Sequence, residues 1–267
     1  MECSKRPPPL LVLGRLTSAL PECVAKAGDM ISVSTNGVDM HDAHAHSDQA
    51  GVLVGNWWAL VGTVLYLSEW VVIIAAAPPG PLGPGDPASS VMSDYAQHAG
   101  AATFSAAWFS VVLVGRVLFV AGLKASLRGR PTVRPLLDLA LGAMAISVVM
   151  EIVGYGIVAG TARFAADGGS VDVVTGLDSA TFWLILLIWG PIGVSVLACG
   201  LAMLRSGVFR AWLPWLALIA GLAGIVGCLM AGASTEGTGV SNAVTTVAAL
   251  GMWVWMISTS VVLVRRR

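Results

Sequence analysis

The sequence predicts an all-α, polytopic membrane protein, a bundle of six transmembrane helices with both termini in the cytoplasm. Three observations carry this prediction: the composition, the recurrence of long apolar stretches, and the sorting of charge between the connectors. Apolar residues make up 56% of the 267 residues and charged residues 11%, whereas soluble domains average roughly 45–50% and about 25%. A soluble protein of this size could not cover its surface with so few charges, but a lipid-facing protein can.

Apolar stretches long enough to cross a bilayer recur from Val52 onward. A helix needs roughly 20 such residues to cross about 30 Å of hydrocarbon. Polar or Gly/Pro-rich connectors separate the stretches, and the Pro-Pro-Gly-Pro run at 78–81 ends the first because proline cannot continue a helix. The predicted spans are 52–77, 101–123, 135–160, 178–204, 211–232 and 243–264.

The charges of the connectors predict the orientation. The second and fourth connectors and the C-terminus are basic, with Lys124, Arg128, Arg130, Arg134, Arg205, Arg210, Arg265, Arg266 and Arg267. The alternate connectors have Arg163 as their single basic residue. The positive-inside rule therefore assigns the basic connectors and both termini to the cytoplasm. Four tryptophans near span ends on that side fit an aromatic belt: Trp57, Trp58, Trp212 and Trp215.

Residues 1–51 differ from the rest of the chain. They are Pro-rich and then Ser-, Asp- and His-rich, a composition that predicts a disordered cytoplasmic tail before a transmembrane domain over 52–267. Three histidines in this tail could ligate a transition metal, but nothing preorganises them. We interpret them as a solvated segment, and the sequence predicts no metal site and no cofactor; they are His41, His44 and His46.

Ionisable side chains inside the spans are the first candidates for a functional site, because each costs about 2.5–3.5 kcal/mol or more at the bilayer centre. There are three: Glu69 in the first span, Arg116 in the second and Glu151 in the third. At about 1.5 Å per residue, both glutamates lie roughly 24 Å from the cytoplasmic ends of their spans, and Arg116 roughly 12 Å. A direct Arg–Glu pair therefore requires extended side chains or boundaries shifted by one turn.

Polar neighbours accompany both glutamates. Ser147, Glu151 and Tyr155 share one helix face at i, i+4 and i+8, and Tyr66 lies three residues before Glu69. Two carboxyl groups close together would share a proton, as a proton-coupled carrier needs. The interpretation that we favour is structural: the arginine and a glutamate hold helices together, or the arginine extends to a lipid phosphate.

Backbone features add two weaker signals. Pro191 lies in the middle of the fourth span, where it removes a backbone hydrogen bond and kinks the helix. Broken helices line binding sites in many transporters, yet proline kinks also occur in membrane helices without a transport role. The fifth span has a stripe of small residues that predicts a helix-packing seam: Ala217, Gly221, Gly224, Gly227, Cys228 and Ala231.

The connector at 78–100 is the longest. It contains Asp94, Tyr95 and His98, whose spacing would bring them together on a short helix. The alternative interpretation is a solvated lid that has no functional side chains.

The hairpin at 204–221 resembles a group of uncharacterised bacterial six-helix membrane proteins. In that group a helix ends in Leu-Arg, and a short basic turn leads to Arg-Trp-Leu and a Gly-rich helix. This chain has Leu204-Arg205 and then Arg210 and Trp212, but Ala211 separates the last two. The resemblance would cover about 52–264, and it implies the six-helix fold and the bacterial plasma membrane. It implies no activity.

Three classes of function remain open. The first is a non-enzymatic membrane protein with a binding, sensing or partner-stabilising role. Its predicted partners are the lipid bilayer and either further copies of itself or another membrane protein. The second is a small proton-coupled permease using Glu69, Glu151 and the Pro191 break. The third is an intramembrane enzyme acting on a lipid or quinone, for which Asp178 with Arg163 is the one hint. We rank them in that order. Zero net charge gives no basic field for nucleic acid, so no nucleic-acid partner is predicted.

Overall fold

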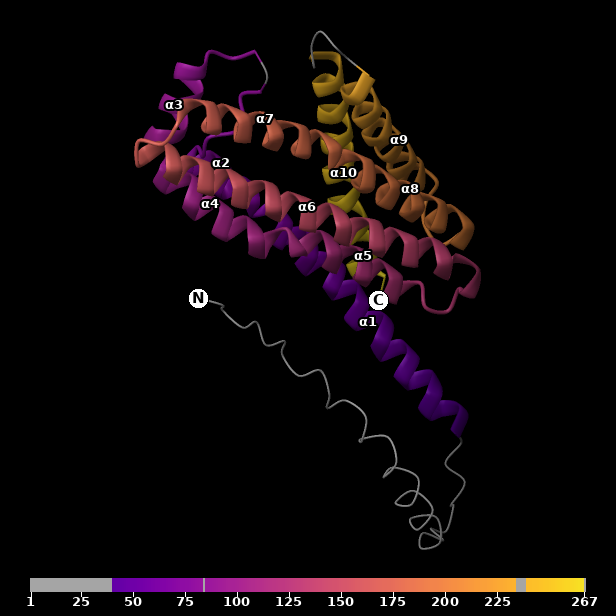
Figure 1. The fold of residues 1–267 in the computed structure, drawn as a ribbon. Coiled ribbons are helices and arrows are strands. Elements are labelled where there is room, and N and C mark those ends of the chain that lie inside the picture. Colours follow the sequence, from indigo (N-terminus) through magenta and orange to yellow (C-terminus); the bar gives the residue numbers. More distant parts are fainter. Residues whose placement is uncertain (1–39, 84, 234–238, 267) are drawn as a thin grey trace, which may run out of the picture. The chain divides into compact units, whose positions relative to one another are not determined.

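The computed structural model describes residues 40–83, 85–233 and 239–266, with side chains from Val54 onward, and within these ranges every regular element is helical. The helices are α1 (Met40–Leu67), α2 (Glu69–Ala76), α3 (Ala88–Gln97), α4 (Ala99–Val112), α5 (Val114–Ser126), the short 3₁₀ helix η1 (Pro131–Val133), α6 (Arg134–Ala166), α7 (Val171–Leu187), α8 (Trp189–Ser206), α9 (Trp212–Ala233) and α10 (Gly239–Arg265) (Figure 1).

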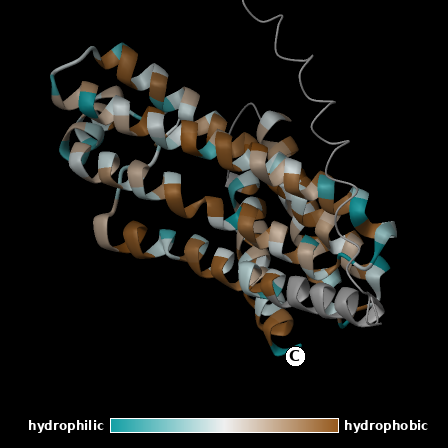
Figure 2. Ribbon diagram, turned by 90° about the horizontal axis from the view of Figure 1, so that it is seen from below, coloured by the Kyte–Doolittle hydropathy of each residue, from teal (hydrophilic) through white to brown (hydrophobic). Residues whose placement is uncertain are grey.

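Six segments are long and apolar enough to cross a membrane, which confirms the predicted fold class. They are Val54–Ala76, Ala99–Ser126, Pro131–Ala166, Val171–Ser206, Trp212–Ala233 and Val240–Arg265. The chain is therefore a multi-pass membrane protein. Hydrophobic residues follow these helices along their length, and many hydrophilic residues lie toward the helix ends (Figure 2).

The largest boundary differences fall in the third and fourth spans, which are 36 residues each. The connector predicted at 161–177 is almost entirely helical, because α6 continues to Ala166 and α7 begins at Val171. Charged residues end an apolar stretch, but they do not end a helix once it has left the hydrocarbon. Helices longer than the roughly 20 residues of a span extend past the bilayer core or tilt within it.

The N-terminal segment is described only in part. α1 begins at Met40, so residues 40–51 of the predicted tail are helical. The rest of that tail, and the side chains of the three histidines, lie outside the described residues.

Within the bundle, α6 lies against α4 and α5 on one side and α7 and α8 on the other (Figure 1). α9 packs against both α8 and α10. α1 meets α10 through a buried hydroxyl pair, Thr63 and Ser260, whose oxygens are 2.8 Å apart. α6 and α8 thus have the most helix neighbours in the bundle, and the first and last spans lie next to each other.

Glycines permit the closest helix contacts. A Cβ on Gly62 of α1 would lie 2.5 Å from the backbone nitrogen of Phe119 in α5, and a Cβ on Gly193 of α8 would lie 2.6 Å from the Gly221 carbonyl of α9. Such small-residue contacts stabilise membrane helices by close packing. The seam predicted from the small residues of the fifth span is therefore present, between α8 and α9.

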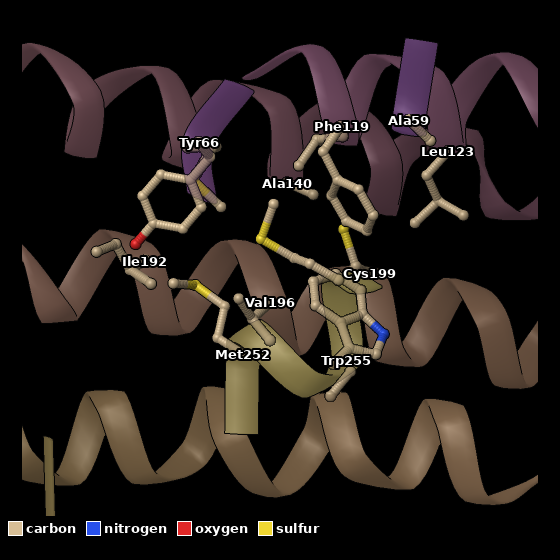
Figure 3. Packing of buried hydrophobic residues seen from close by; sticks show 14 of the residues in the cluster. Ala59, Tyr66, Phe119, Leu123, Ala140, Ile192, Val196, Cys199, Met252 and Trp255 are labelled. Atoms are coloured by element: carbon tan, nitrogen blue, oxygen red, sulfur yellow. The ribbon is translucent and has the colours of Figure 1, made fainter. Parts of the chain in front are cut away.

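Aromatic and sulfur-containing side chains fill the space between the seams (Figure 3). Trp255 of α10 is fully buried and meets Phe119 edge-on, with ring centroids 5.0 Å apart. Met252 and Cys199 lie in the same buried cluster. This core joins α5, α8 and α10, and Tyr66 at its margin leads into the polar region described next.

Candidate functional site

Arg116 and Glu151 form a direct, buried ion pair. A guanidinium nitrogen of Arg116 donates to Glu151 Oε2, and the arginine is 1% exposed. The guanidinium carbon also lies 5.0 Å from the centre of the Tyr66 ring, a cation–π contact. The second span ends at Ser126 instead of 123 and the third begins at Pro131 instead of 135, so both Arg116 and Glu151 lie further from these ends than the sequence predicts.

Glu69 lies beside this pair without a cation of its own. It is 5% exposed, and the Tyr155 hydroxyl donates to Glu69 Oε1 over 3.2 Å. No ion pair joins Glu69 to any described residue. The cluster therefore combines two carboxyl groups with one guanidinium, and a bound proton or a bound cation is needed to balance both carboxylates in a low-dielectric site.

The two glutamates line a cavity of about 480 Å³. This volume falls within the roughly 300–1,000 Å³ typical of small-molecule sites. Five of the twelve lining residues are aromatic, from four different spans: Tyr66, Trp70, Tyr155, Trp189 and Trp253. The remainder are Glu69, Ile73, Glu151, Thr245, Thr246, Ala249 and Leu250.

Aromatic contacts fix one wall of the cavity. The Trp253 indole N–H donates to the Tyr66 hydroxyl over 3.2 Å, and Trp70 packs edge-on against Trp253 with centroids 4.7 Å apart. Phe109 supports Tyr155 from behind, with centroids 4.4 Å apart. These contacts join the aromatic side chains of α1, α2 and α10 into one wall.

The cavity opens sideways, toward lipid. Of its lining residues, Thr246 and Leu250 of α10 and Trp70 of α2 are exposed on the surface of the bundle. All three belong to membrane-spanning segments. The mouth therefore lies between α2 and α10, on the outer surface of two membrane-spanning segments.

Three spans change their helical geometry next to this cluster. At Ser68, Leu113 and Ile188 the backbone has ψ between −12° and −25°, and a new helix begins at the following residue. Such angles approach the tighter 3₁₀ form, which is uncommon in the middle of a helix. Glu69 and Trp189 directly follow two of these residues.

Two of the interruptions have a visible cause. The Ser68 hydroxyl donates to the Leu65 carbonyl over 2.6 Å, a back-bond that bends helices. Pro191 has no N–H for the Leu187 carbonyl, and the Cys228 thiol of α9 lies 3.8 Å from that oxygen instead. The helix interruption at Ile188 lies three residues before Pro191. The kink at Pro191 stays a prediction, and Trp189, not the proline, lines the cavity.

Other residues singled out in the sequence lie elsewhere. Ser147 is buried but donates to its own helix, to the Met144 carbonyl over 2.7 Å, and does not line the cavity. Asp178 and Arg163 do not form a common site: Asp178 is 1% exposed and Arg163 is exposed, and no hydrogen bond or ion pair joins them within the described chain.

Asp178 instead anchors the long connector. Its carboxylate accepts hydrogen bonds from the backbone N–H groups of Leu82 and Gly83, over 3.1 and 2.9 Å, and from the Tyr95 hydroxyl, over 2.9 Å. Gly83 has φ +100°, and a Cβ there would meet the Phe182 ring at 2.9 Å. Burial and the adjacent carboxylate raise the pKa of Tyr95 well above its usual value of 10.0, so the phenol remains a donor.

The short helix predicted from Asp94, Tyr95 and His98 is α3, with His98 as its C-cap. The solvated-lid interpretation is wrong for Tyr95, which is fully buried. Asp94 and His98 pair on the solvated side, 3.1 Å apart. Because an aromatic ring on one face of a short amphipathic helix buries itself against neighbouring helices, the connector is packed against α6 and α7.

Sequence reasoning named Tyr66 and Tyr155 but missed the three tryptophans and the two threonines of the cavity. Trp70 follows Glu69 directly, and Trp189 lies two residues before Pro191, so proximity to those two features was the available signal. Nothing in the sequence alone brings Trp253, Thr245 and Thr246 to the same place, because this depends on how α10 packs.

No protein-family model, curated protein or solved structure matches this chain. The family suggested by the 204–221 hairpin is thus not identified. Of what that resemblance implied, the structure supports the six membrane-spanning helices.

Proposed function

We propose that the protein is a non-enzymatic, membrane-embedded binding protein whose ligand is a hydrophobic organic cation that enters the Glu69 cavity from the bilayer. The observation that carries this proposal is a buried carboxyl group without a cationic partner in an aromatic-lined cavity. Aromatic faces and carboxylates are the groups that recognise organic ammonium and related cations. An anionic ligand is disfavoured, because it would add charge of the same sign.

The charge balance implies exchange between the ligand and a proton. With Arg116 neutralising Glu151, the remaining carboxyl group is balanced by one proton or by one bound cation. Binding of the cation therefore displaces the proton, and protons compete with the ligand as the pH falls.

The test uses tetraphenylphosphonium as the probe and tetraphenylborate as an anion of the same shape. Equilibrium dialysis on the full chain in detergent should give saturable binding of the phosphonium, weaker at lower pH, and no saturable binding of the borate. Glu69→Gln should reduce the affinity at least tenfold. Asp172→Asn removes an exposed carboxylate at the start of α7 and should leave the affinity unchanged. Equal binding by wild type and Glu69→Gln would reject the proposal.

A second candidate function, proton-coupled transport of such a cation, is favoured by the helix interruptions beside the cavity. Discontinuous helices line the substrate sites of many secondary transporters, and here two interruptions adjoin the lining residues Glu69 and Trp189. In proteoliposomes, transport would appear as phosphonium flux driven by a pH gradient and abolished in Glu69→Gln. Binding without flux would leave the first proposal and remove the second.

The host membrane in this proposal is the bacterial plasma membrane. The support is the composition, which is rich in Ala, Gly and Val and uses Arg in preference to Lys, as is typical of GC-rich genomes, together with the resemblance of the 204–221 hairpin. The proposal also includes a second copy of the chain or a membrane partner protein as a neighbour of the bundle in the membrane.

A further inference from the structure

A second cavity, of about 380 Å³, lies at the basic end of the bundle, between the C-terminal end of α5 and the start of α6. It is separate from the Glu69 cavity and shares no lining residue with it. Four of its nine lining residues are cationic: Lys124, Arg128, Arg130 and Arg134. The other five are apolar: Ala121, Ala125, Leu127, Leu137 and Leu141.

The positive charges of this basic cavity are only partly neutralised. Lys124 pairs with Asp138, and Arg134 Nε lies 3.9 Å from the other oxygen of the same carboxylate. Asp138 is the only acidic residue between Arg116 and Glu151 in the sequence. Arg128 and Arg130 are exposed and have no ion pair to any described residue. A formal excess of three positive charges therefore surrounds the cavity.

The backbone that carries these charges is held in consecutive tight turns. The N–H of Arg128 donates to the Ala125 carbonyl, that of Arg130 to the Leu127 carbonyl, and that of Val133 to the Arg130 carbonyl, over 3.0–3.3 Å. These hydrogen bonds order the backbone of the connector from which the arginines extend.

Two of the apolar lining residues, Ala121 and Leu141, lie further into their spans than the charged ones. Ala121 lies seven residues before Arg128 on the second span and its following turn, and Leu141 lies seven residues after Arg134 on α6, so each apolar residue is roughly 10 Å deeper along its helix. Ala121 and Leu141 are half-buried, whereas Leu127 and Leu137 are buried. A basic rim above an apolar wall has the same order as a phospholipid, with its phosphate above its acyl chains.

We propose that this basic cavity binds an anionic phospholipid of the adjoining leaflet. Its phosphate lies among Lys124, Arg128 and Arg130, and an acyl chain lies along Ala121 and Leu141. Basic pockets between membrane helices recognise anionic headgroups in this manner. The apolar wall selects a lipid over a soluble phosphate, because a free anion would leave that wall without a partner.

The test uses short-chain lipids with identical tails. Native mass spectrometry of the full chain should retain dioctanoyl phosphatidylglycerol and not dioctanoyl phosphatidylcholine. Inorganic phosphate should not compete at equal concentration, and added salt should weaken retention. Equal retention of the two lipids, or equal competition by phosphate, would overturn the proposal; the second result would indicate a site for a soluble anion.

Matched variants locate the site. Arg128→Gln combined with Arg130→Gln should weaken phosphatidylglycerol binding roughly ten- to thirtyfold, because each variant removes the attraction of one arginine to the anionic lipid. Arg205→Gln combined with Arg210→Gln removes the same charge from the other basic connector and should change the affinity less than threefold. Asp138→Asn should strengthen binding, because it releases Lys124. An equal loss in both double variants, or no gain in Asp138→Asn, would contradict the assignment.

Discussion

At the scale of single residues, the two buried glutamates have different partners. Glu151 is paired with Arg116, whereas Glu69 is buried with a phenol as its donor. The sequence treats the three charged residues as equivalent candidates, since each is a lone charge in an apolar helix. Only the packing decides which carboxyl group receives the arginine.

The ion pair leads to a stability prediction. Arg116→Met leaves the Glu151 carboxylate buried and unpaired, and should lower the free energy of unfolding by about 3–5 kcal/mol. Glu151→Gln should lower it as well, but the double variant should be more stable than Arg116→Met alone, because neither charge then remains. SDS-titrated unfolding in mixed micelles measures all three. Strictly additive losses would mean that the two side chains do not interact.

At the scale of helices, the spans were predictable and their internal breaks were predictable only in part. Length and hydropathy locate all six spans, because a helix that crosses the bilayer needs roughly 20 consecutive, mostly apolar residues. Pro191 marks one break, since proline lacks an N–H. The breaks at Ser68 and Leu113 have no such residue, and the first depends on a serine back-bond that many helical serines could form.

Glycine seams provide an element-scale prediction with an internal control. Gly62→Ala in α1 inserts a methyl group against the backbone of α5, and overpacking of this kind costs about 1–3 kcal/mol. Gly142→Ala in α6 meets nothing within 4 Å and should leave stability unchanged or raise it by up to about 1 kcal/mol. Thermal unfolding of both variants in the same detergent compares them directly. Similar effects in the two would show that the α1–α5 contact is not close.

At the scale of the whole molecule, the six spans found in the described residues predict that the segments before the first and after the last span lie on one side of the membrane, and the charge pattern predicts that this side is the cytoplasm. Substituted cysteines can test this prediction in a background in which Cys3, Cys23, Cys199 and Cys228 are replaced. A membrane-impermeant maleimide should label Asp167→Cys in intact cells. It should label Arg210→Cys only after the membrane is opened. The reverse pattern would overturn the positive-inside assignment for this chain.

The long connectors show where a whole-molecule description goes beyond sequence patterns. Composition predicts that 78–100 and 161–177 lie outside the hydrocarbon, but it does not predict that Asp178 draws Leu82, Gly83 and Tyr95 onto the bundle. These partners are separated by 83 to 96 residues. No local periodicity encodes a contact of that range.

The pairing of Arg116 with Glu151 also sets an order for biogenesis. The arginine leaves the ribosome 35 residues before its acceptor, which at 5–20 residues per second is a delay of roughly 2–7 s. A nascent chain with three spans already possesses the complete charged centre, but Trp189 and Trp253 of the aromatic wall arrive only with the fourth and sixth spans. The cavity beside the charged centre is therefore complete only after the last helix has been inserted.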